Sequence, residues 1–312
     1  MTGERKCFVF HILFSCAVGT GGNMRQLSEL NLVDNFLANS LTSHKRYGEP
    51  AARCILECTL GRKLGKLRVV PQHFIQGENM DRHGVRLDVY LDEEDGAGEL
   101  FDLEPDNNDG KEDMASLPKR ARFYHSKLDA ENFKSGEKYE KLRNVYVIFI
   151  MTYDPFHAGR MVYTVKSGCV EMPELLYEDG ARTIFLYTRG KNGNPPESLR
   201  QLLNYMEHTT RENAGTEDLR KLHDMVTAVK TDGEVGLAYM KFFELEERTL
   251  QKGRREGKAE DILDLLCELG EVSPAVREKI LAQKEDAVLR TWLKLAARAE
   301  STADFVQKAF TN

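Results

Sequence analysis

The sequence predicts an α/β fold whose core elements follow the order α-β-β-β-α-β, with an all-helical region after them. Three patterns lead to this prediction. Residues 85–93 alternate between apolar and polar side chains, which is typical of a strand with one buried face. Residues 144–151 form an unbroken, β-rich apolar run, as in a strand buried on both faces. From Pro196 onward the apolar residues recur at helical spacing.

The core begins with a predicted helix over 50–60 and a strand over 67–75. Gly61 is expected to end the helix, because glycine readily adopts the left-handed conformation found after helix C-termini. The turn-forming run 95–98 then joins the alternating strand to a further strand over 99–104. These two strands are therefore expected to form a hairpin.

Residues 107–113 are polar and acidic, and a loop is expected there. Ser116 and Pro118 predict a helix start near Pro118, because serine caps helix N-termini and proline suits the first turn. The apolar 144–151 strand follows and is expected at the centre of its sheet. Short strands are predicted at 163–165 and 183–187. Helices are predicted over 198–205, 217–229, 235–250, 261–269, 273–281 and 287–299.

The whole-chain composition is that of an ordinary globular protein. Of the 312 residues, 41% are hydrophobic and 30% charged, and the formal net charge is −6. This balance excludes a chain coated in positive charge, although a local basic stripe could still contact nucleic acid. No apolar run approaches the roughly 20 residues of a membrane-spanning helix, so no membrane association is expected. The 6 cysteines lack zinc-finger spacing, which favours a reducing compartment and a cytoplasmic location.

Four segments are expected along the chain. In residues 1–23 a basic pair precedes an apolar stretch, and we interpret the segment as a non-native extension from an upstream start, with a signal peptide as the alternative. Residues 24–250 form the main domain with a helical extension. Residues 251–258 are basic and contain glycine, as in a linker, and residues 259–312 form a small helical tail.

The predicted hairpin brings two acidic residues together. Its turn places Leu91 opposite Phe101, and the same register places Asp88 opposite Glu104, with Cβ atoms roughly 4.5–5.5 Å apart. Two carboxylates at that distance repel each other, and a bridging divalent cation would remove the conflict. The alternative is that this face is simply solvated, with Asp92 and Asp102 as further exposed acids.

The element order and several motifs resemble the PD-(D/E)XK nuclease core, in particular the recombination-promoting nuclease and putative transposase family. Such a core is a mixed sheet flanked by helices. The resemblance extends over roughly Met24 to Phe305. The matching stretches include His83-Gly84-Val85-Arg86-Leu87-Asp88-Val89-Tyr90, Phe101-Asp102-Leu103-Glu104 and Leu117-Pro118-Lys119-Arg120-Ala121-Arg122-Phe123-Tyr124.

This resemblance implies that Asp88 and Glu104 hold Mg²⁺ or Mn²⁺. The residue two positions after the second acid is usually lysine, or glutamine in this family, and it assists catalysis. Here that catalytic position is Asp106, whose negative charge cannot stabilise a developing anion. The register predicts that Asp106 faces Arg86 and forms an ion pair with it.

A cation from the next helix could take over the missing role. Lys119, Arg120 and Arg122 are the candidates there, and the resemblance also implies that they contact DNA phosphates. A solvated helix face is the alternative explanation for them.

The sequence therefore predicts a metal-dependent DNA endonuclease-like protein linked to recombination or mobile elements, weakened by Asp106. The alternative is a catalytically inactive relative that binds DNA or protein. A homo-oligomer, and a protein partner for the helical tail, both stay open.

Overall fold

The computed structural model describes residues 25–75, 85–94 and 98–310. The chain divides into two compact units, Met1–Tyr239 and Met240–Asn312. The expected extension or signal segment at 1–23 lies outside the described residues, as does most of the hairpin turn, at 95–97. Within the described residues, no helix is both long enough and apolar enough to cross a membrane.

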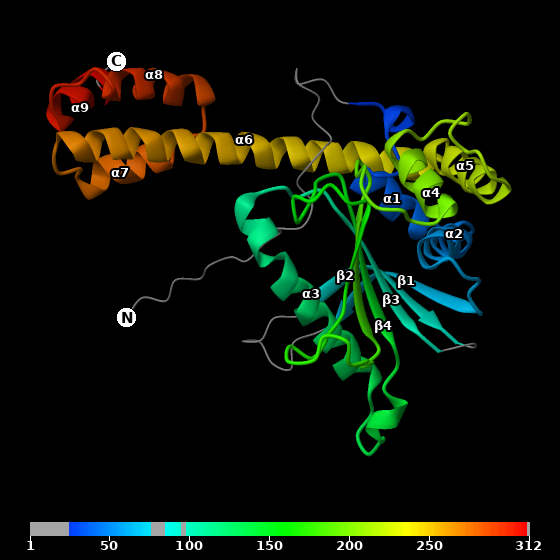
Figure 1. Cartoon of the computed structure of the whole chain (residues 1–312). Helices are drawn as coiled ribbons and strands as arrows, with labels where there is room; N and C mark the ends of the chain where they lie inside the picture. Colours follow the sequence, from blue (N-terminus) through cyan, green and yellow to red (C-terminus); the bar gives the residue numbers. More distant parts are fainter. Residues whose placement is uncertain (1–24, 76–84, 95–97, 311–312) are drawn as a thin grey trace. The chain divides into compact units, whose positions relative to one another are not determined.

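Unit 1 is built on a mixed sheet, and the strands described there number six (Figure 1). Their order in the sheet is β1-β2-β3-β4-β6-β5. The β3–β4 and β4–β6 pairs are parallel, and the other neighbours are antiparallel. The strands are β1 (Leu67–Ile75), β2 (Val85–Glu93), β3 (Leu100–Asp106), β4 (Val145–Met151), β5 (Val162–Val165) and β6 (Ala181–Tyr187).

The position of β4 confirms the strongest sequence prediction. This strand lies between β3 and β6, and Val145, Val147 and Phe149 are buried. A strand covered on both faces needs apolar side chains in both directions, which explains its continuous apolar run. At the edge of the sheet, β1 tolerates Pro71 because an edge strand leaves one row of backbone groups unpaired.

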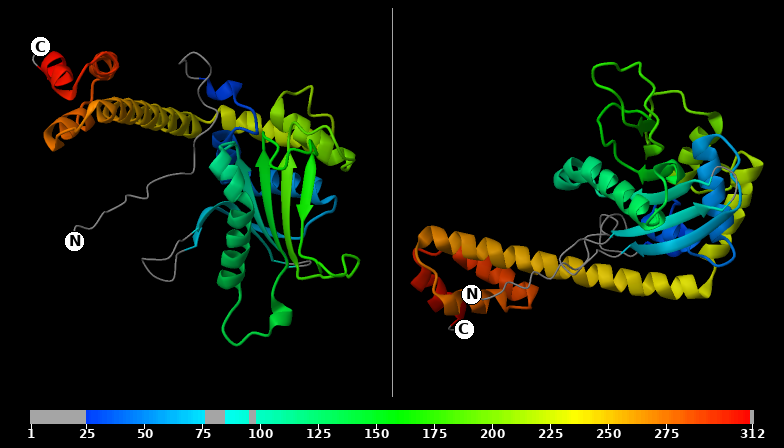
Figure 2. Two further views of the ribbon diagram at one scale, coloured as in Figure 1. Left: turned by 60° about the vertical axis from the view of Figure 1, so that its left-hand side comes forward. Right: turned by 90° about the horizontal axis from the view of Figure 1, so that it is seen from below.

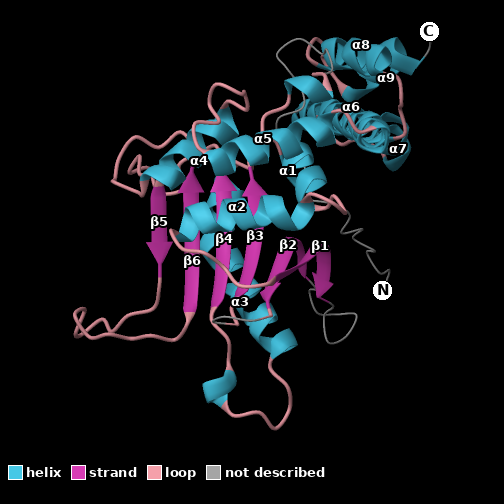
Figure 3. Ribbon diagram, turned by 90° about the vertical axis from the view of Figure 1, so that its right-hand side faces the viewer, coloured by secondary structure: helices cyan, strands magenta, loops and turns pink. Residues whose placement is uncertain are grey.

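Helices cover both faces of the sheet (Figure 3). One face carries α3 (Lys111–Asn132), and the other carries the group that contains α1 and α2. As predicted, α2 ends at Gly61, whose φ of 68° is left-handed. The helices of unit 1 other than α3 and the start of α6 form this second layer or connect the strands. They are η1 (Leu27–Glu29), α1 (Asn35–Thr42), α2 (Gly48–Leu60), η2 (Tyr139–Lys141), α4 (Glu197–Glu207) and α5 (Glu217–Lys230).

The start of α3 differs from the prediction. The helix begins at Lys111, so the acidic segment expected as a loop supplies its first turn, and Pro118 lies inside it. Acidic residues suit that turn because they interact favourably with the positive end of the helix dipole. Ser116 does not cap the helix. Its hydroxyl donates to the backbone carbonyl of Asp113 at 2.9 Å.

Unit 2 is helical, as predicted for the tail. It contains most of α6 (Gly233–Leu269), followed by α7 (Pro274–Leu281), α8 (Asp286–Ala296) and α9 (Thr302–Phe310). These three shorter helices gather beside the C-terminal part of α6 (Figure 2). Their shared core contains Ile262, Leu266, Leu289, Trp292 and Phe305.

The expected linker at 251–258 is helical and lies in the middle of α6. The boundary between the units falls earlier, between Tyr239 and Met240. The linker prediction relied on two glycines, each of which costs a helix only about 1 kcal/mol. Arginine, lysine and glutamate, which fill most of the segment, are good helix formers. Lys252 and Glu256 also form an i,i+4 ion pair at 3.7 Å.

Candidate active site

The β2–β3 hairpin forms in the predicted register. Val89 pairs with Leu103, and Leu91 pairs with Phe101. All four side chains are buried. The next residues bring the two predicted acids together, because Oε1 of Glu104 accepts a hydrogen bond from the backbone N–H of Asp88 at 2.8 Å. The carboxylate of Glu104 therefore reaches the adjacent strand at the position of Asp88.

The strand is irregular at this point, which the sequence pattern did not reveal. Strict alternation along β2 would place Leu87 and Val89 on one face and Tyr90 on the other. Instead Leu87 packs with Tyr90 in the cluster beneath α3, so that expectation is wrong. In the neighbouring strand Gln72 has a φ of 53°, and its side-chain amide donates to Oδ1 of Asp88 at 3.4 Å. Backbone conformations of this kind are strained in a residue other than glycine, and they are frequent beside active sites.

A third acid joins this pair. Asp102 is two residues before Glu104 on β3, and its side chain has no exposed surface. Neither of its carboxylate oxygens accepts a hydrogen bond from any described residue. Sequence reasoning placed Asp102 on an exposed face and so missed it. The period of two along β3 was the available signal, because it places Asp102 and Glu104 on the same face.

Asp106 pairs with a different arginine from the one predicted. Its carboxylate forms an ion pair with Arg120 of α3. Arg86, the predicted partner, is exposed and lies where β2 pairs with Phe74 of β1. Because α3 begins earlier than expected, Arg120 sits well inside the helix and follows Leu117 on the side that faces the sheet.

The guanidinium of Arg120 lies among the acids. It sits over the ring of Phe149, 5.2 Å from the centroid, and Phe149 is the register partner of Glu104. The charge of Arg120 lowers the pKa of Asp88 and of Asp102, although burial raises both pKa values more strongly. Nε of Arg120 is buried and has no hydrogen-bond partner among the described residues. One cation from α3 thus faces the carboxylates of β2 and β3.

The family comparison agrees with this geometry. Residues 53–175 match the model of the PD-(D/E)XK nuclease family transposase. The chain is therefore similar to this family over residues 53–175, and we call this segment the nuclease-family domain. It contains the hairpin, α3 and every predicted site residue of the nuclease-family domain. No curated protein and no solved structure matches the chain.

Burial sets the charge state of the acids in the nuclease-family domain. It raises the pKa of Asp88 to about 6, and it raises the pKa of Asp102 well above its ordinary value. The pKa of Glu104 is also raised well above its ordinary value, first by burial and then by the charges of Asp102 and Asp88. Each of these shifts favours the protonated, neutral form of the acid.

These residues fit a divalent cation. Carboxylate oxygens are the ligands that Mg²⁺ and Mn²⁺ prefer, and both oxygens of Asp102 are buried without a hydrogen-bond donor among the described residues. Within the described residues, no group of three or more Asp, Glu, His or Cys side chains is arranged to hold a metal ion. Mg²⁺ is commonly held by only one or two carboxylates, with water and substrate phosphate completing its shell. Asp88 and Glu104 could supply that pair.

The other predicted residues of α3 lie elsewhere. Lys119 and Arg122 are exposed, and neither forms an ion pair with another described residue. Tyr124 is buried, and its ring stacks on Phe149 with centroids 6.2 Å apart. Burial raises the pKa of its hydroxyl group, so Tyr124 stays neutral and serves the packing of α3 on the sheet.

Proposed function

We propose that the nuclease-family domain hydrolyses phosphodiester bonds of DNA, in recombination or in the movement of mobile elements. The observation that carries this proposal is the group of buried acids on the β2–β3 hairpin, in which Asp102 has no hydrogen-bond donor among the described residues. Folding alone gives no reason to bury such a group, because each buried carboxylate loses its hydration. A substrate phosphate together with a divalent cation would give these acids a partner.

In this proposal each residue has a defined role. Asp88 and Glu104 hold Mg²⁺ or Mn²⁺, which when bound activates water and polarises the phosphoryl group. Asp102 maintains the negative field around Glu104 and favours cation binding. Arg120 faces the same space from α3 and stabilises the negative charge that develops on the phosphate. Asp106 orients Arg120 through their ion pair.

Arg120 would thereby replace the positive charge that is missing at position 106, where this chain has Asp106. A lysine at position 106 would supply a positive charge from the strand, whereas here an aspartate on the strand holds an arginine from the helix. The positive charge is available in both arrangements, although it comes from a different element. We therefore expect turnover, at a rate limited by how well the guanidinium reaches the phosphate.

Nicking of supercoiled plasmid by the full chain tests the proposal. We expect nicking with Mg²⁺ or Mn²⁺, none with EDTA, and none from Asp88→Asn, which preserves shape but removes a cation ligand. Asp92→Asn is the matched control. Asp92 lies on the same strand, but its carboxylate is bound to Arg68 and Arg143, each at 2.7 Å, outside the acid group. Nicking that survives both EDTA and Asp88→Asn would refute the proposed site.

A second candidate function is binding of DNA or protein without cleavage. It is favoured by the acid at position 106, where the family has lysine or glutamine. In that case the chain would retain DNA in a gel-shift assay, and neither cation would produce nicks. The cysteines at 54, 58, 169 and 267 are free thiols, and we propose a reducing, cytoplasmic setting for either function.

A further inference from the structure

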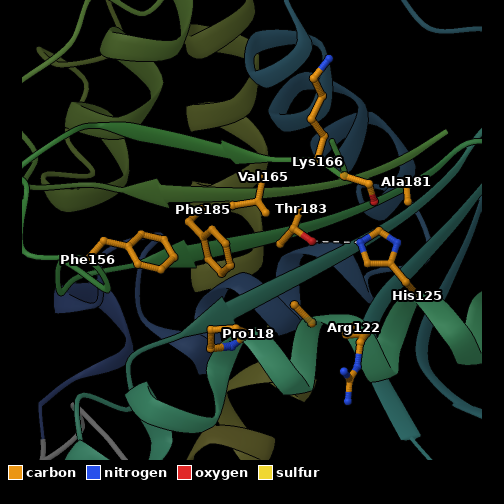
Figure 4. A pocket seen from close by; sticks show the side chains of 11 residues that line it. Pro118, Arg122, His125, Phe156, Val165, Lys166, Ala181, Thr183 and Phe185 are labelled. Atoms are coloured by element: carbon orange, nitrogen blue, oxygen red, sulfur yellow. Dashed lines mark hydrogen bonds between the residues drawn. The ribbon is translucent and has the colours of Figure 1, made fainter. Parts of the chain in front are cut away.

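A cavity of about 350 Å³ lies on the α3 face of the sheet, apart from the acid group (Figure 4). One wall comes from α3, with Pro118, Arg122 and His125. The opposite wall comes from β6 and the segment before β5, with Thr183, Phe185 and Phe156. Its volume falls within the range of small-ligand sites, which is about 300–1,000 Å³.

The cavity lies two strands away from the proposed active site. Glu104 of β3 pairs in register with Phe149 of β4, and Phe149 pairs with Phe185 of β6. Two strand spacings amount to about 10 Å. The same helix serves both places, because Arg120 reaches the acids while Arg122 and His125 line the cavity. A nucleic acid strand seated on the acids would therefore pass close to the cavity.

The cavity walls suit a flat, partly apolar group. Phe156 packs edge-on against Phe185 with centroids 5.1 Å apart, yet 40% of Phe156 is exposed. An aromatic ring that is held in place but left open to solvent offers a stacking surface. Val165, at the rim, is also largely exposed.

Polar groups at the cavity have unused bonding capacity. One ring nitrogen of His125, Nε2, shares a hydrogen bond with Oγ1 of Thr183 at 2.9 Å. The other, Nδ1, is buried and has no partner among the described residues. Burial lowers the pKa of His125, so its ring is neutral near physiological pH and adds no charge to the cavity wall.

A positive charge at the rim is also available. Lys166 lines the cavity but is paired with Glu178 at 3.0 Å. Arg122 is exposed and forms no ion pair with a described residue. Its guanidinium points outward from α3 (Figure 4). The cavity thus combines an aromatic wall, a neutral imidazole ring and an unpaired cation.

We propose that this cavity binds one unstacked nucleotide of the DNA strand beside the cleaved phosphate. The base lies against Phe156, beside the neutral ring of His125, and the adjoining phosphate lies at Arg122. The inference builds on the proposed nuclease function and deepens it. The enzyme would then select DNA with an unpaired or easily extruded base close to the cleavage point.

Binding of a fluorescent base tests this inference. The full chain carrying Asp88→Asn, kept in EDTA to prevent cleavage, is titrated into duplexes that contain 2-aminopurine either unpaired or paired. We expect the unpaired duplex to bind about tenfold more tightly, with quenched fluorescence, because base–aromatic stacking contributes about 1–3 kcal/mol. Phe156→Ala should remove most of that preference, and Arg122→Ala should weaken binding of both duplexes.

Lys127→Ala is the matched control, since it removes one positive charge from the same helix at a residue that does not line the cavity. Unchanged thermal unfolding of each variant excludes misfolding. Equal affinity for the two duplexes, or a preference unaffected by Phe156→Ala, would overturn the inference. Equally tight binding of free 2-aminopurine deoxyribonucleoside monophosphate would overturn the assignment to a DNA strand. Because cleavage is not measured, a failure here is distinct from a failure to nick plasmid.

Discussion

The carboxylate of Asp102 lies inside the nuclease-family domain. It has no exposed surface and accepts no hydrogen bond from any described residue. A buried polar group left unsatisfied costs roughly 1–3 kcal/mol, and more when it is charged. Asp88 and Glu104, close by, add repulsion to that cost. Three residues that destabilise the folded state together are best explained by a ligand that compensates them.

The raised pKa of Asp88 predicts how stability depends on pH. Its pKa rises from 3.8 to about 6 on folding, so between these values the folded state binds more protons than the unfolded state. The contribution of Asp88 to the free energy of unfolding is therefore fully present below about pH 4 and is lost as the pH rises through about 6. The free energy of unfolding falls by about 3 kcal/mol over this range. In EDTA, Asp88→Asn should become more stable relative to the unmodified chain as the pH rises.

Urea denaturation at about pH 5 and about pH 8 measures roughly half of this difference, since the loss begins at about pH 4. Comparing the two proteins cancels the carboxylates that do not interact with Asp88, several of which have lowered pKa values and act in the opposite direction. Mg²⁺ should reverse the trend for the unmodified chain, because a cation binds only the ionised carboxylates. A stability gap that stays constant across this pH range would show that Asp88 is ionised in the folded state throughout.

The Asp106–Arg120 pair predicts a compensating double substitution. Arg120→Gln should lower nicking by about 10²–10³, which is the usual cost of removing a charge-stabilising donor. Asp106→Lys in the same chain should recover part of that rate, since the new ammonium group extends from the strand into the same space. Asp106→Lys alone places two cations together, and we expect no gain from it. Steady-state nicking rates, with Lys127→Gln as a charge-matched control, provide the measurement; a full rate from Arg120→Gln would remove Arg120 from the mechanism.

At the scale of single elements, the hairpin and β4 were predictable because their signals are local. Alternation and turn residues determine the register, and a continuous apolar run indicates a central strand. The partner of Asp106 was not predictable in the same way. It depends on where α3 begins, and the acidic first turn of that helix looks like a loop in sequence. The positive φ of Gln72 is equally hidden, because nothing in the sequence distinguishes this glutamine from one with an ordinary strand conformation.

The central part of α6 carries a prediction of its own. Gly253 and Gly257 lie inside the helix, and an added Cβ at either would meet nothing within 4 Å. Alanine there should stabilise the helix by about 0.5–1 kcal/mol per site, because glycine loses more backbone entropy on folding. Gly61→Ala is the contrasting control and should destabilise, since its φ of 68° disfavours a side chain. Chemical denaturation followed by circular dichroism would reveal the gain, and its absence at both sites would indicate that residues 251–258 are not helical in solution.

At the scale of the whole molecule, the division into two units predicts two separable unfolding transitions. The chain has 1 tryptophan, and Trp292 lies in unit 2, where its ring contacts Phe310 edge-on at 5.0 Å and its Nε1 donates to the carbonyl of Ala309 at 3.1 Å. Tryptophan fluorescence therefore reports on unit 2 alone. Plasmid nicking reports on unit 1, which contains the acid group and Arg120.

Phe305→Ala should separate the two transitions. This side chain has no exposed surface in the core of unit 2, and removing a buried phenylalanine ring costs about 3–5 kcal/mol. The thermal midpoint seen by Trp292 should fall, while the temperature at which nicking is lost should stay the same. Phe101→Ala, which removes an equally buried ring from unit 1, should shift the nicking midpoint and leave the fluorescence midpoint unchanged. If either substitution moves both midpoints together, the units unfold as one cooperative block, because folding coupled across α6 would transmit the loss from one core to the other.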